Sequence, residues 1–435
     1  MTERYLADHL LPMDPAFSLH SPGVVDVRRG RVVASGPPAE APALGPGDLV
    51  RRVGGFLMPG LINCHAHSAM TVLRGAGEGL PLDRWLREVI WPREARLTPD
   101  DALRGMLVGA AEMLLGGITT SVEMYFHAGA VAEGAVAAGL RTLVFPAVAE
   151  APGWERFGTA GDMVRAAVAL REALVGEDLV EVGLGPHSAY LLGDAALREV
   201  AEVAADRAMP VHLHVAETRT EGDGVLARTG KTVPAHLASL GFFGRRTLAA
   251  YGVWLTPEDV ALFAEHGVAV AHCPGSNGKL ASGLAPVAAL RRAGVAVGVG
   301  TDGPASNDNL DLWEEARLAL LYSRLREGDA GSLGVEDALR FMTSGAAAAL
   351  GRDDPGALLP GRRADMVRLS LDDVVYDPVL APRDLPGLLI WAGSRRDVTD
   401  VWVGGRRVVE GGKCRTVDLE RERAALRGAA ARLAG

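Results

Sequence analysis

The segment Pro59-Gly60-Leu61-Ile62-Asn63-Cys64-His65-Ala66-His67 decides how the rest of the chain is interpreted. Its apolar residues predict a buried strand over 61–67 that ends in two histidines. Side chains alternate across a β-strand, so residues two apart face the same side and the two imidazoles are expected to point to one place. A pair at this spacing also arises by accident. The interpretation therefore depends on partners elsewhere in the chain.

Those partners lie far downstream, each at the end of a short apolar run. They are His187, His214 with Glu217 close behind it, His272 and Asp302. In a (β/α)8 barrel the chemistry gathers at the carboxyl ends of the parallel strands. Polar residues that close successive strands are therefore expected to meet at one mouth of the barrel.

Strand and helix patterns alternate through the middle of the chain. Eight strands are expected near 61–67, 118–123, 142–147, 180–187, 211–216, 248–253, 268–272 and 295–301. A helix begins at Thr98-Pro99, with an N-cap threonine and a proline in the first helical position, and ends at Gly116-Gly117. The segment from Thr256 to Gly267 repeats this pattern. The alternation favours an α/β fold with a parallel barrel over an open sheet.

Both ends of the chain predict small antiparallel strands instead. Residues 23–27 and 31–34 are β-prone pieces between glycine and proline clusters, and residues 364–369 and 398–412 repeat the pattern with a Gly404-Gly405 hairpin. We expect the two ends to form one small β-domain. The expected boundaries are 1–56 for its N-terminal part, 57–357 for the barrel and 358–435 for its C-terminal part.

Composition narrows the class of protein. The chain is 48% hydrophobic and 23% charged, as in ordinary soluble globular proteins. Its net charge of −9 and the lack of a dense Lys/Arg run argue against a nucleic-acid partner. Cys64, Cys273 and Cys414 are too far apart for a disulfide framework. With no signal-like N-terminus and no run of ~20 apolar residues, we expect a cytoplasmic protein without membrane contact.

With these residues in view, the chain resembles the amidohydrolase superfamily. The similarity is to its branch of methylthioadenosine/S-adenosylhomocysteine deaminases and the related triazine hydrolases (TRZ/ATZ). The strand-end residues carry the resemblance, together with the loops Pro274–Gly283 and Thr301–Asn307. It implies a TIM-like metal-dependent hydrolase barrel with a small composite β-sandwich built from both termini.

The ligand set follows from the residue types and from this resemblance. Catalytic zinc keeps about three protein ligands plus water, and histidine with carboxylate is an ordinary set. We expect His65, His67, His214 and Asp302 to hold one divalent metal. Relatives with two metals carry a carboxylated lysine on strand four, where this chain has His187 and no lysine nearby. Zinc is expected, although iron or manganese suits the same ligands.

Two other histidines receive a structural interpretation. His212 shares the face of His214 but sits two residues, roughly 6.6 Å, deeper in the barrel, so it is interpreted as structural. His272 either orients one of the two loops or is a buried structural imidazole.

The implied reaction is hydrolytic deamination of an adenine-type nucleoside or related purine with release of ammonia. A bound metal lowers the pKa of its water toward ~7. Asp302 would accept a proton from that water. Glu217 would hold a proton on the ring nitrogen, which requires a carboxyl whose pKa is raised by burial. The plainer alternative for Glu217 is a solvent-facing loop acid.

The substrate contacts come from the resemblance alone. It assigns His187 and Glu94 to the substrate, and a core imidazole and a solvated acid are the alternatives. The segment 68–97 resembles the family's covering segment, and long loops at a barrel mouth are usually functional. Relatives bind the carboxylate of S-adenosylhomocysteine with arginines, for which Arg74, Arg141 and Arg156 are candidates. Because such loops in relatives pack against a second subunit, a homo-oligomer acting on a small molecule is expected.

Strand six departs from the family pattern. Relatives carry a histidine there that orients the metal-bound water, whereas this chain has Tyr251 before Gly252-Val253-Trp254-Leu255-Thr256. A tyrosine hydroxyl can donate a hydrogen bond but is a poor base at neutral pH. Deamination with Tyr251 in the histidine's role is the favoured interpretation. A triazine-type amidohydrolase or chlorohydrolase, a guanine-type deaminase and a non-catalytic binding protein stay open.

Overall fold

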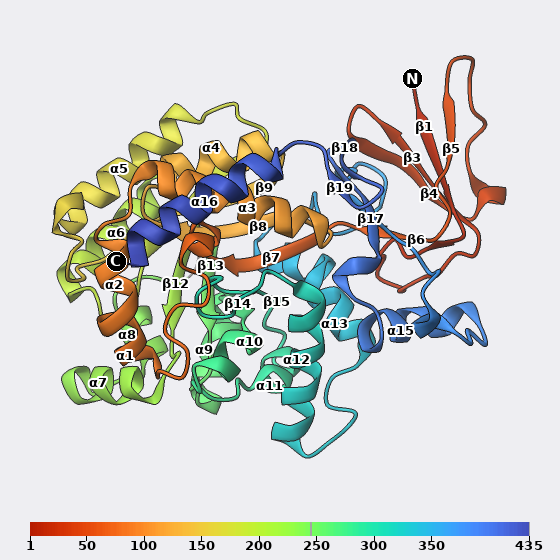
Figure 1. Ribbon diagram of the computed structural model, residues 1–435. Coiled ribbons are helices and arrows are strands. Elements are labelled where there is room, and N and C mark those ends of the chain that lie inside the picture. The colour runs from red at the N-terminus through yellow and green to blue at the C-terminus, as the bar shows by residue number, and fades with distance from the viewer. Residues whose placement is uncertain (244–245, 435) are drawn as a thin grey trace.

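The computed structural model describes residues 1–243 and 246–434. Figure 1 shows a barrel wrapped by helices, with a small β-domain beside it that carries the N-terminus. The barrel strands are β7 (Leu61–Ala66), β8 (Ile118–Tyr125), β9 (Arg141–Val148), β10 (Val180–Val182) with β11 (Gly185–Pro186), β12 (Val211–Val215), β13 (Thr247–Tyr251), β14 (Ala269–His272) and β15 (Val297–Val299). Each expected strand position therefore holds a strand.

The barrel consists of two parallel sheets that meet at two seams. Strands β7 to β10 pair in sequence order, and so do β12 to β15. One seam is bridged by Leu184 and Val211, and the other by Ala66 and Asp302. At the second seam the backbone N–H of Asp302 donates to the carbonyl of His65 over 3.0 Å. The strands thus run in order around the barrel, which confirms the predicted fold class and brings the end of β15 beside the end of β7.

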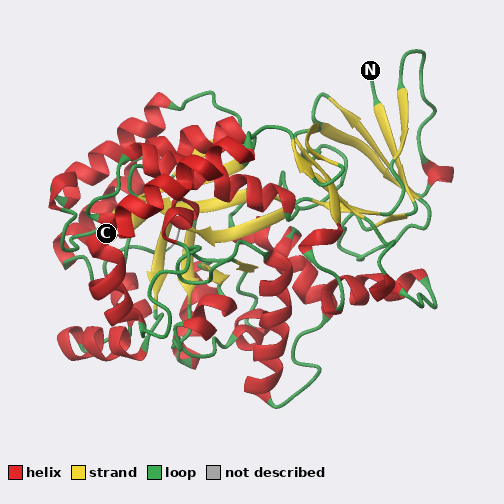
Figure 2. Cartoon of the chain, in the orientation of Figure 1, coloured by secondary structure: helices red, strands yellow, loops and turns green. Residues whose placement is uncertain are grey.

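Helices cover the outside of the barrel (Figure 2). They include α3 (Pro99–Leu115), α4 (Ala128–Ala138), α5 (Ala160–Ala173), α6 (Asp194–Asp206), α7 (Arg219–Thr229), α8 (Val233–Ser239), α9 (Pro257–His266), α11 (Val287–Arg292), α12 (Leu312–Glu327), α13 (Val335–Met342) and α14 (Ser344–Ala349). The predicted start of α3 is confirmed, since the Thr98 side chain accepts from the backbone N–H of Asp101 and the Asp101 side chain reaches back. Helix α9 repeats this capping box at Thr256 and ends at Gly267, whose φ of 64° suits glycine.

Short helices line the barrel mouth. After β7 come the 3₁₀ helix η2 (Ser68–Leu73), α1 (Leu82–Trp85), the π-helical turn η3 (Leu86–Ile90) and α2 (Trp91–Glu94); α10 (Pro274–Lys279) follows β14. Together, α1, η3 and α2 form the covering segment (Leu82–Glu94). The predicted loop over the site is therefore largely helical.

The small β-domain has two sheets. One joins β1 (Glu3–Ala7), β3 (Gly23–Arg28), β4 (Arg31–Gly36) and β5 (Leu49–Arg52). The other joins both ends of the chain: β2 (His9–Leu10), β6 (Phe56–Pro59), β16 (Met366–Leu369), β17 (Val398–Val403), β18 (Arg406–Glu410) and β19 (Lys413–Cys414). A separate apolar core that includes Tyr5, Leu10 and Trp402 lies in this domain. The domain boundaries at 56 and 358 stay a prediction.

The C-terminal part of the chain also contributes helices to the barrel side. Helix α15 (Leu385–Trp391) packs against α12 and α13. Helix α16 (Leu419–Ala434) packs against α3 and η2 and crosses the barrel in Figure 1. The segment after residue 358 therefore both completes the small domain and covers part of the barrel. Across the described residues, the helices lack the combination of length and apolar character that a bilayer crossing requires.

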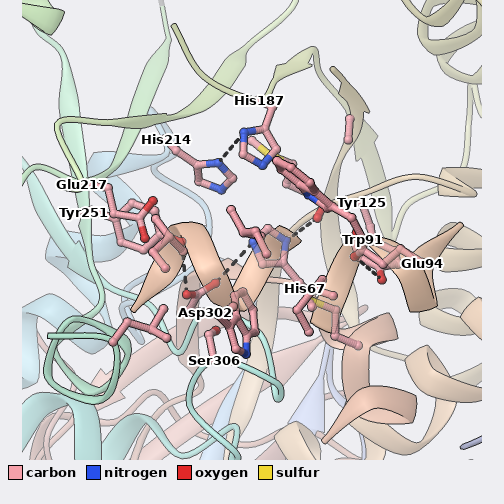
Figure 3. Close-up of a pocket in the computed structure, with 18 of the residues that line it drawn as sticks. His67, Trp91, Glu94, Tyr125, His187, His214, Glu217, Tyr251, Asp302 and Ser306 are labelled. Carbon is pink, nitrogen blue, oxygen red and sulfur yellow. Dashed lines mark hydrogen bonds and ion pairs between the residues drawn. The ribbon is translucent and has the colours of Figure 1, made fainter. Parts of the chain in front are cut away.

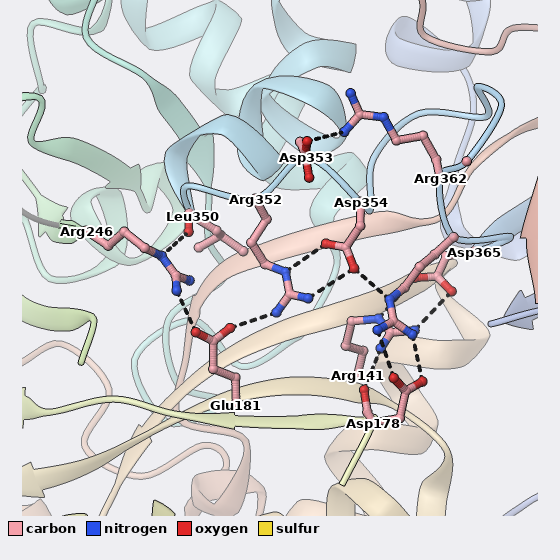
Figure 4. A network of polar contacts seen from close by, with 12 residues as sticks. Arg141, Asp178, Glu181, Arg246, Leu350, Arg352, Asp353, Asp354, Arg362 and Asp365 are labelled. Atoms are coloured by element: carbon pink, nitrogen blue, oxygen red, sulfur yellow. Dashed lines mark hydrogen bonds and ion pairs between the residues drawn. The ribbon is translucent and has the colours of Figure 1, made fainter. Parts of the chain in front are cut away.

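A network of ion pairs connects the barrel to the small β-domain (Figure 4). Arg141 at the start of β9 is 2% exposed, and its Nε lies 3.2 Å from a carboxylate oxygen of Asp365, which is 1% exposed. Arg363 links Asp178 to Asp354, each at 2.6 Å. Arg352 links Asp354 to Glu181, and Arg246 also pairs with Glu181. The candidate assignment of Arg141 to a substrate carboxylate is thus replaced by a structural role, because Asp365 holds its guanidinium at the far end of the strand from the site.

Candidate active site

The side chains of His67, His214 and Asp302 converge at the carboxyl ends of the barrel strands (Figure 3), and His65 lies beside them. A ring nitrogen from each of His65, His67 and His214 lies within 4.8 Å of the other two. Asp302 Oδ1 lies 3.5 Å from His65 Nε2 and 3.3 Å from His67 Nε2. The sequence therefore predicted correctly that these residues, which span more than half the chain, come together.

Hydrogen bonds on the outer ring nitrogens determine where each imidazole carries its proton. Because carbonyl oxygens only accept, His67 Nδ1 donates to the carbonyl of Met124, and His212 Nδ1 donates to that of Leu248 over 2.9 Å. His212 Nε2 must then accept from His65 Nδ1, at 2.7 Å. The Nε2 atoms of His65 and His67 are consequently left as lone-pair donors facing the centre. His212 thus supports a neighbour rather than facing the cavity.

The arrangement fits a divalent cation. Nε2 of His65 and Nε2 of His214 are buried and have no hydrogen-bond partner within the described structure. Burial lowers the pKa of both imidazoles, so both are neutral and able to bind a metal. Three neutral imidazole nitrogens and one carboxylate form a donor set that divalent transition metals accept.

Asp302 is held in place by donors from three sides. Ser276 Oγ donates to Oδ2 over 2.6 Å, the Tyr251 hydroxyl donates to the same atom over 3.1 Å, and the N–H of Gly303 donates to Oδ1 over 2.8 Å. Burial acts to raise the pKa of Asp302, but the imidazoles of His65 and His67 and the Ser276 hydroxyl beside the carboxylate outweigh burial and hold the pKa below its usual value. Asp302 is therefore a carboxylate.

Both partners in the Tyr251–Asp302 contact have left-handed backbones. Tyr251 has φ 73° and Asp302 has φ 58°. A residue without glycine's freedom in this region costs of order 1–3 kcal/mol and typically persists at functional sites. The strained backbone aims the Tyr251 hydroxyl at the carboxylate from the position where relatives were expected to carry histidine.

Glu217 brings a second carboxyl to the same centre. It is 3% exposed, and its Oε1 has no partner among the described residues. Burial, followed by the charges of Asp302 and Glu221, raises the pKa of Glu217 well above its usual value. Its backbone N–H donates to Glu221 over 2.8 Å, which fixes the turn after β12. A protonated carboxyl facing a cavity can donate that proton.

These groups open onto a cavity at the barrel mouth, where small-molecule sites of such barrels lie. The other lining residues include Met70, Leu82, Trp85, Leu86, Ile90, Trp91, Glu94, Met124, Tyr125, Trp154, His187, Tyr190, Leu280 and Ser306. Glu94 accepts a hydrogen bond from the Tyr125 hydroxyl over 2.8 Å, and burial raises the pKa of Glu94 to about 7. Burial lowers the pKa of His187 to about 3, so its imidazole is neutral.

Arg74 does not lie with the other predicted site residues. Its guanidinium pairs with Glu112 on α3 and donates to the carbonyl of Asp308, outside the lining of the cavity. The assignment of Arg74 to the substrate is thus corrected, because the Glu112 carboxylate pairs with its guanidinium outside the cavity lining. Arg156 is likewise engaged, donating to the carbonyls of Glu94 and Leu97.

Several residues of the site were not identified from the sequence. Ser276 lies in the loop that carried the resemblance, and Tyr125 ends β8, so both had a signal that could have been used. Trp154 follows β9 in an irregular segment, where no sequence pattern pointed to it. His272 is buried below the site, and its backbone carbonyl accepts from Gly300 over 2.9 Å.

Known proteins match this chain over most of its length. A model of the amidohydrolase family matches residues 56–408. A 5-methylthioadenosine/S-adenosylhomocysteine deaminase of Teredinibacter turnerae is 39% identical over 360 residues, 82% of this chain and 80% of that protein. The crystal structure of a Xanthomonas campestris adenosine deaminase with bound zinc has a TM-score of 0.94 and 35% identity, covering 99% of this chain and 98% of that one. The zinc complex of the atrazine chlorohydrolase TrzN from Arthrobacter aurescens TC1 has a TM-score of 0.90 and 26% identity, covering 98% and 100%.

Proposed function

This chain belongs to the amidohydrolase family, and from that premise we propose that it hydrolytically deaminates an adenine-type nucleoside of the methylthioadenosine kind. It is a hydrolase that acts on a carbon–nitrogen bond. The observation that carries the proposal is the raised pKa of Glu217, whose unpartnered oxygen lies in the cavity shared with the His/Asp cluster. A carboxyl that is both protonated and next to a ligand cluster is what protonation of a purine ring nitrogen requires.

His65, His67, His214 and Asp302 would hold one divalent metal. Zinc is proposed, because the donor set suits it and two similar structures contain zinc. When bound, the ion supplies Lewis acidity that makes water nucleophilic near neutral pH. Tyr251 and Ser276 keep the Asp302 carboxylate oriented through their hydroxyls.

The residues of the chain then divide the proton transfers. Glu217 donates its proton to the ring nitrogen while a water oxygen bonds to the adjacent carbon that bears the exocyclic amine. Asp302 accepts the proton that this water releases and returns it to the departing amine. As the carbon–nitrogen bond breaks and ammonia leaves, the hydroxyl on the ring carbon becomes the carbonyl and gives its proton to Glu217, which restores the acid. Water is therefore the only other reactant.

The rest of the cavity fits a nucleoside. Trp91, Tyr125 and Trp154 provide flat apolar surfaces for a ring system. Glu94 as a carboxylate has acceptor capacity left beyond its bond from Tyr125, which suits the two adjacent hydroxyls of a ribose. His187, in hydrogen-bond distance of His214, also faces the cavity and would contact the substrate. The homo-oligomeric state and the cytoplasmic location stay predictions.

Removal of the metal is expected to abolish ammonia release from adenine-type nucleosides. Protein dialysed against a chelator should regain activity with one equivalent of zinc, because the described residues bring together one group of side chains suited to a metal. Metal content by atomic spectroscopy and ammonia release by a coupled assay check this. Full activity in metal-free protein would contradict the proposal, and so would two tightly held ions per chain.

A panel of candidate substrates distinguishes deamination of adenine-type nucleosides from the alternative functions. The likeness to TrzN favours testing s-triazines, from which release of chloride or an amine without any activity on purines would indicate a triazine hydrolase. Guanine-type compounds belong in the panel for the same reason. Tight binding of a nucleoside with no ammonia released, by native protein and by Tyr251→His alike, would indicate a binding protein.

The Michaelis constant is expected to fall as the pH rises through about 7. The raised pKa of Glu94 means that its carboxyl is protonated below that pH and ionised above it, and only the ionised form accepts from both ribose hydroxyls. A pH profile of KM from 5.5 to 8.5 is the measurement. Glu94→Gln cannot ionise, so its KM should be higher than the native value and independent of pH. If KM of this variant still fell through pH 7 as in the native protein, another group would be titrating.

A further inference from the structure

The described residues that line the cavity include neither lysine nor arginine. The ionisable side chains of this lining are three acids, three tyrosines and three histidines: Glu94, Glu217, Asp302, Tyr125, Tyr190, Tyr251, His67, His187 and His214. Most of the remaining lining is aromatic or aliphatic. Beyond the catalytic end, a substrate therefore meets apolar surface and no lysine or arginine.

Several arginines on the segments around the cavity have partners elsewhere. Arg74 pairs with Glu112, and one nitrogen of Arg156 donates to two backbone carbonyls while its guanidinium stacks on Phe157. On the covering segment, Arg84 pairs with Glu88 and Arg87 with Asp83, and both arginines are more than half exposed. The charges of these two pairs therefore cancel at exposed positions outside the cavity lining.

The inward face of the covering segment is apolar. Leu82, Trp85, Leu86 and Ile90 line the cavity, with Trp85 and Ile90 buried and the two leucines half-buried. Trp85 is fixed by a hydrogen bond from its Nε1 to the carbonyl of Ala76 over 2.9 Å. The segment thus presents a fixed hydrophobic wall opposite the ligand cluster.

Building on the function proposed above, we propose that the substrate carries an uncharged, apolar group at its 5′ end and that a zwitterionic 5′ substituent is rejected. Moving a charged group out of water costs several kcal/mol unless a partner of opposite charge receives it, and the hydrophobic wall offers no such partner. A methylthio or methyl group instead gains from burial against leucine and tryptophan. Methylthioadenosine and 5′-deoxyadenosine fit this rule, and S-adenosylhomocysteine, with its carboxylate and ammonium, does not.

The first test compares kcat/KM for methylthioadenosine, 5′-deoxyadenosine and S-adenosylhomocysteine. We expect the zwitterionic compound to be slower by about 100-fold or more, the range that an unpaired polar group imposes. Values within tenfold of each other would overturn the proposal. If no adenine nucleoside releases ammonia, the proposed function fails on its own. Equilibrium binding of the same three compounds by calorimetry then still tests the apolar selectivity.

Two variants test where the selectivity resides. Leu86→Arg should raise turnover of S-adenosylhomocysteine relative to methylthioadenosine about tenfold, whereas the uncharged Leu86→Met should not. An equal effect of the two changes would overturn the placement of the 5′ group against the covering segment. Arg156→Gln, at an exposed position outside the lining, should leave the ratio unchanged. A selective loss of S-adenosylhomocysteine turnover in that variant would show that Arg156 binds a substrate carboxylate and would overturn the proposal.

Discussion

Glu217→Gln is expected to lower kcat for ammonia release by about 10²–10⁴-fold while changing KM little. Glutamine keeps the shape and one hydrogen-bond acceptor but has no acidic proton to give to the ring nitrogen. Burial and the neighbouring acids raise the pKa of Glu217 and so keep a proton on its carboxyl, and the variant lacks that proton. The contacts that bind the substrate persist. Steady-state kinetics on methylthioadenosine near pH 7 measure both constants.

Glu221→Gln is the matched control for this prediction. Glu221 is buried in the same turn and its pKa is also raised, to about 7, but its carboxylate accepts from the backbone N–H of Glu217 and does not line the cavity. Glutamine preserves an acceptor for that bond, so we expect less than a tenfold change in kcat. Metal content should be unchanged in both variants, since neither residue is among the four ligands. Glu217→Gln protein that keeps a tenth of the native kcat would show that the proton comes from elsewhere.

The barrel and its ligand cluster were predictable because they depend on short-range periodicity. Alternation along β7 places His65 and His67 on one face, and the ends of parallel strands meet whatever the loops between them do. The start of α3 was predictable for a similar reason, since its capping box uses residues only three apart, Thr98 and Asp101.

The interactions that were not predicted link residues far apart in the sequence. Arg74 was assigned to the substrate, but the direction of its long side chain depends on Glu112, which lies 38 residues away. The support that His212 gives His65 crosses 147 residues. Strand pattern could place His212 deeper than His214, but it could not show which ring nitrogen carries the proton. Side-chain partners of this kind follow from packing, which local sequence pattern does not specify.

The charge on Arg141 is expected to be essential for stability rather than for catalysis. Arg141→Leu should lower the free energy of unfolding by about 3–5 kcal/mol, because it leaves the Asp365 carboxylate buried without its cation. Asp365 also accepts from the backbone N–H of Gly404, so the hairpin between β17 and β18 should loosen with it. Urea denaturation followed by tryptophan fluorescence measures the loss.

Two further variants separate the buried pair from an ordinary surface pair. Arg207 and Glu172 lie 3.3 Å apart but are 57% and 66% exposed, so Arg207→Leu should cost no more than about 1 kcal/mol. Adding Asp365→Asn to Arg141→Leu removes the stranded charge and keeps an acceptor for Gly404, so the double variant should regain part of the lost stability. If it were no more stable than Arg141→Leu alone, the cost would come from the missing arginine's packing and its bond to the carbonyl of Asp178, and not from an unpaired carboxylate.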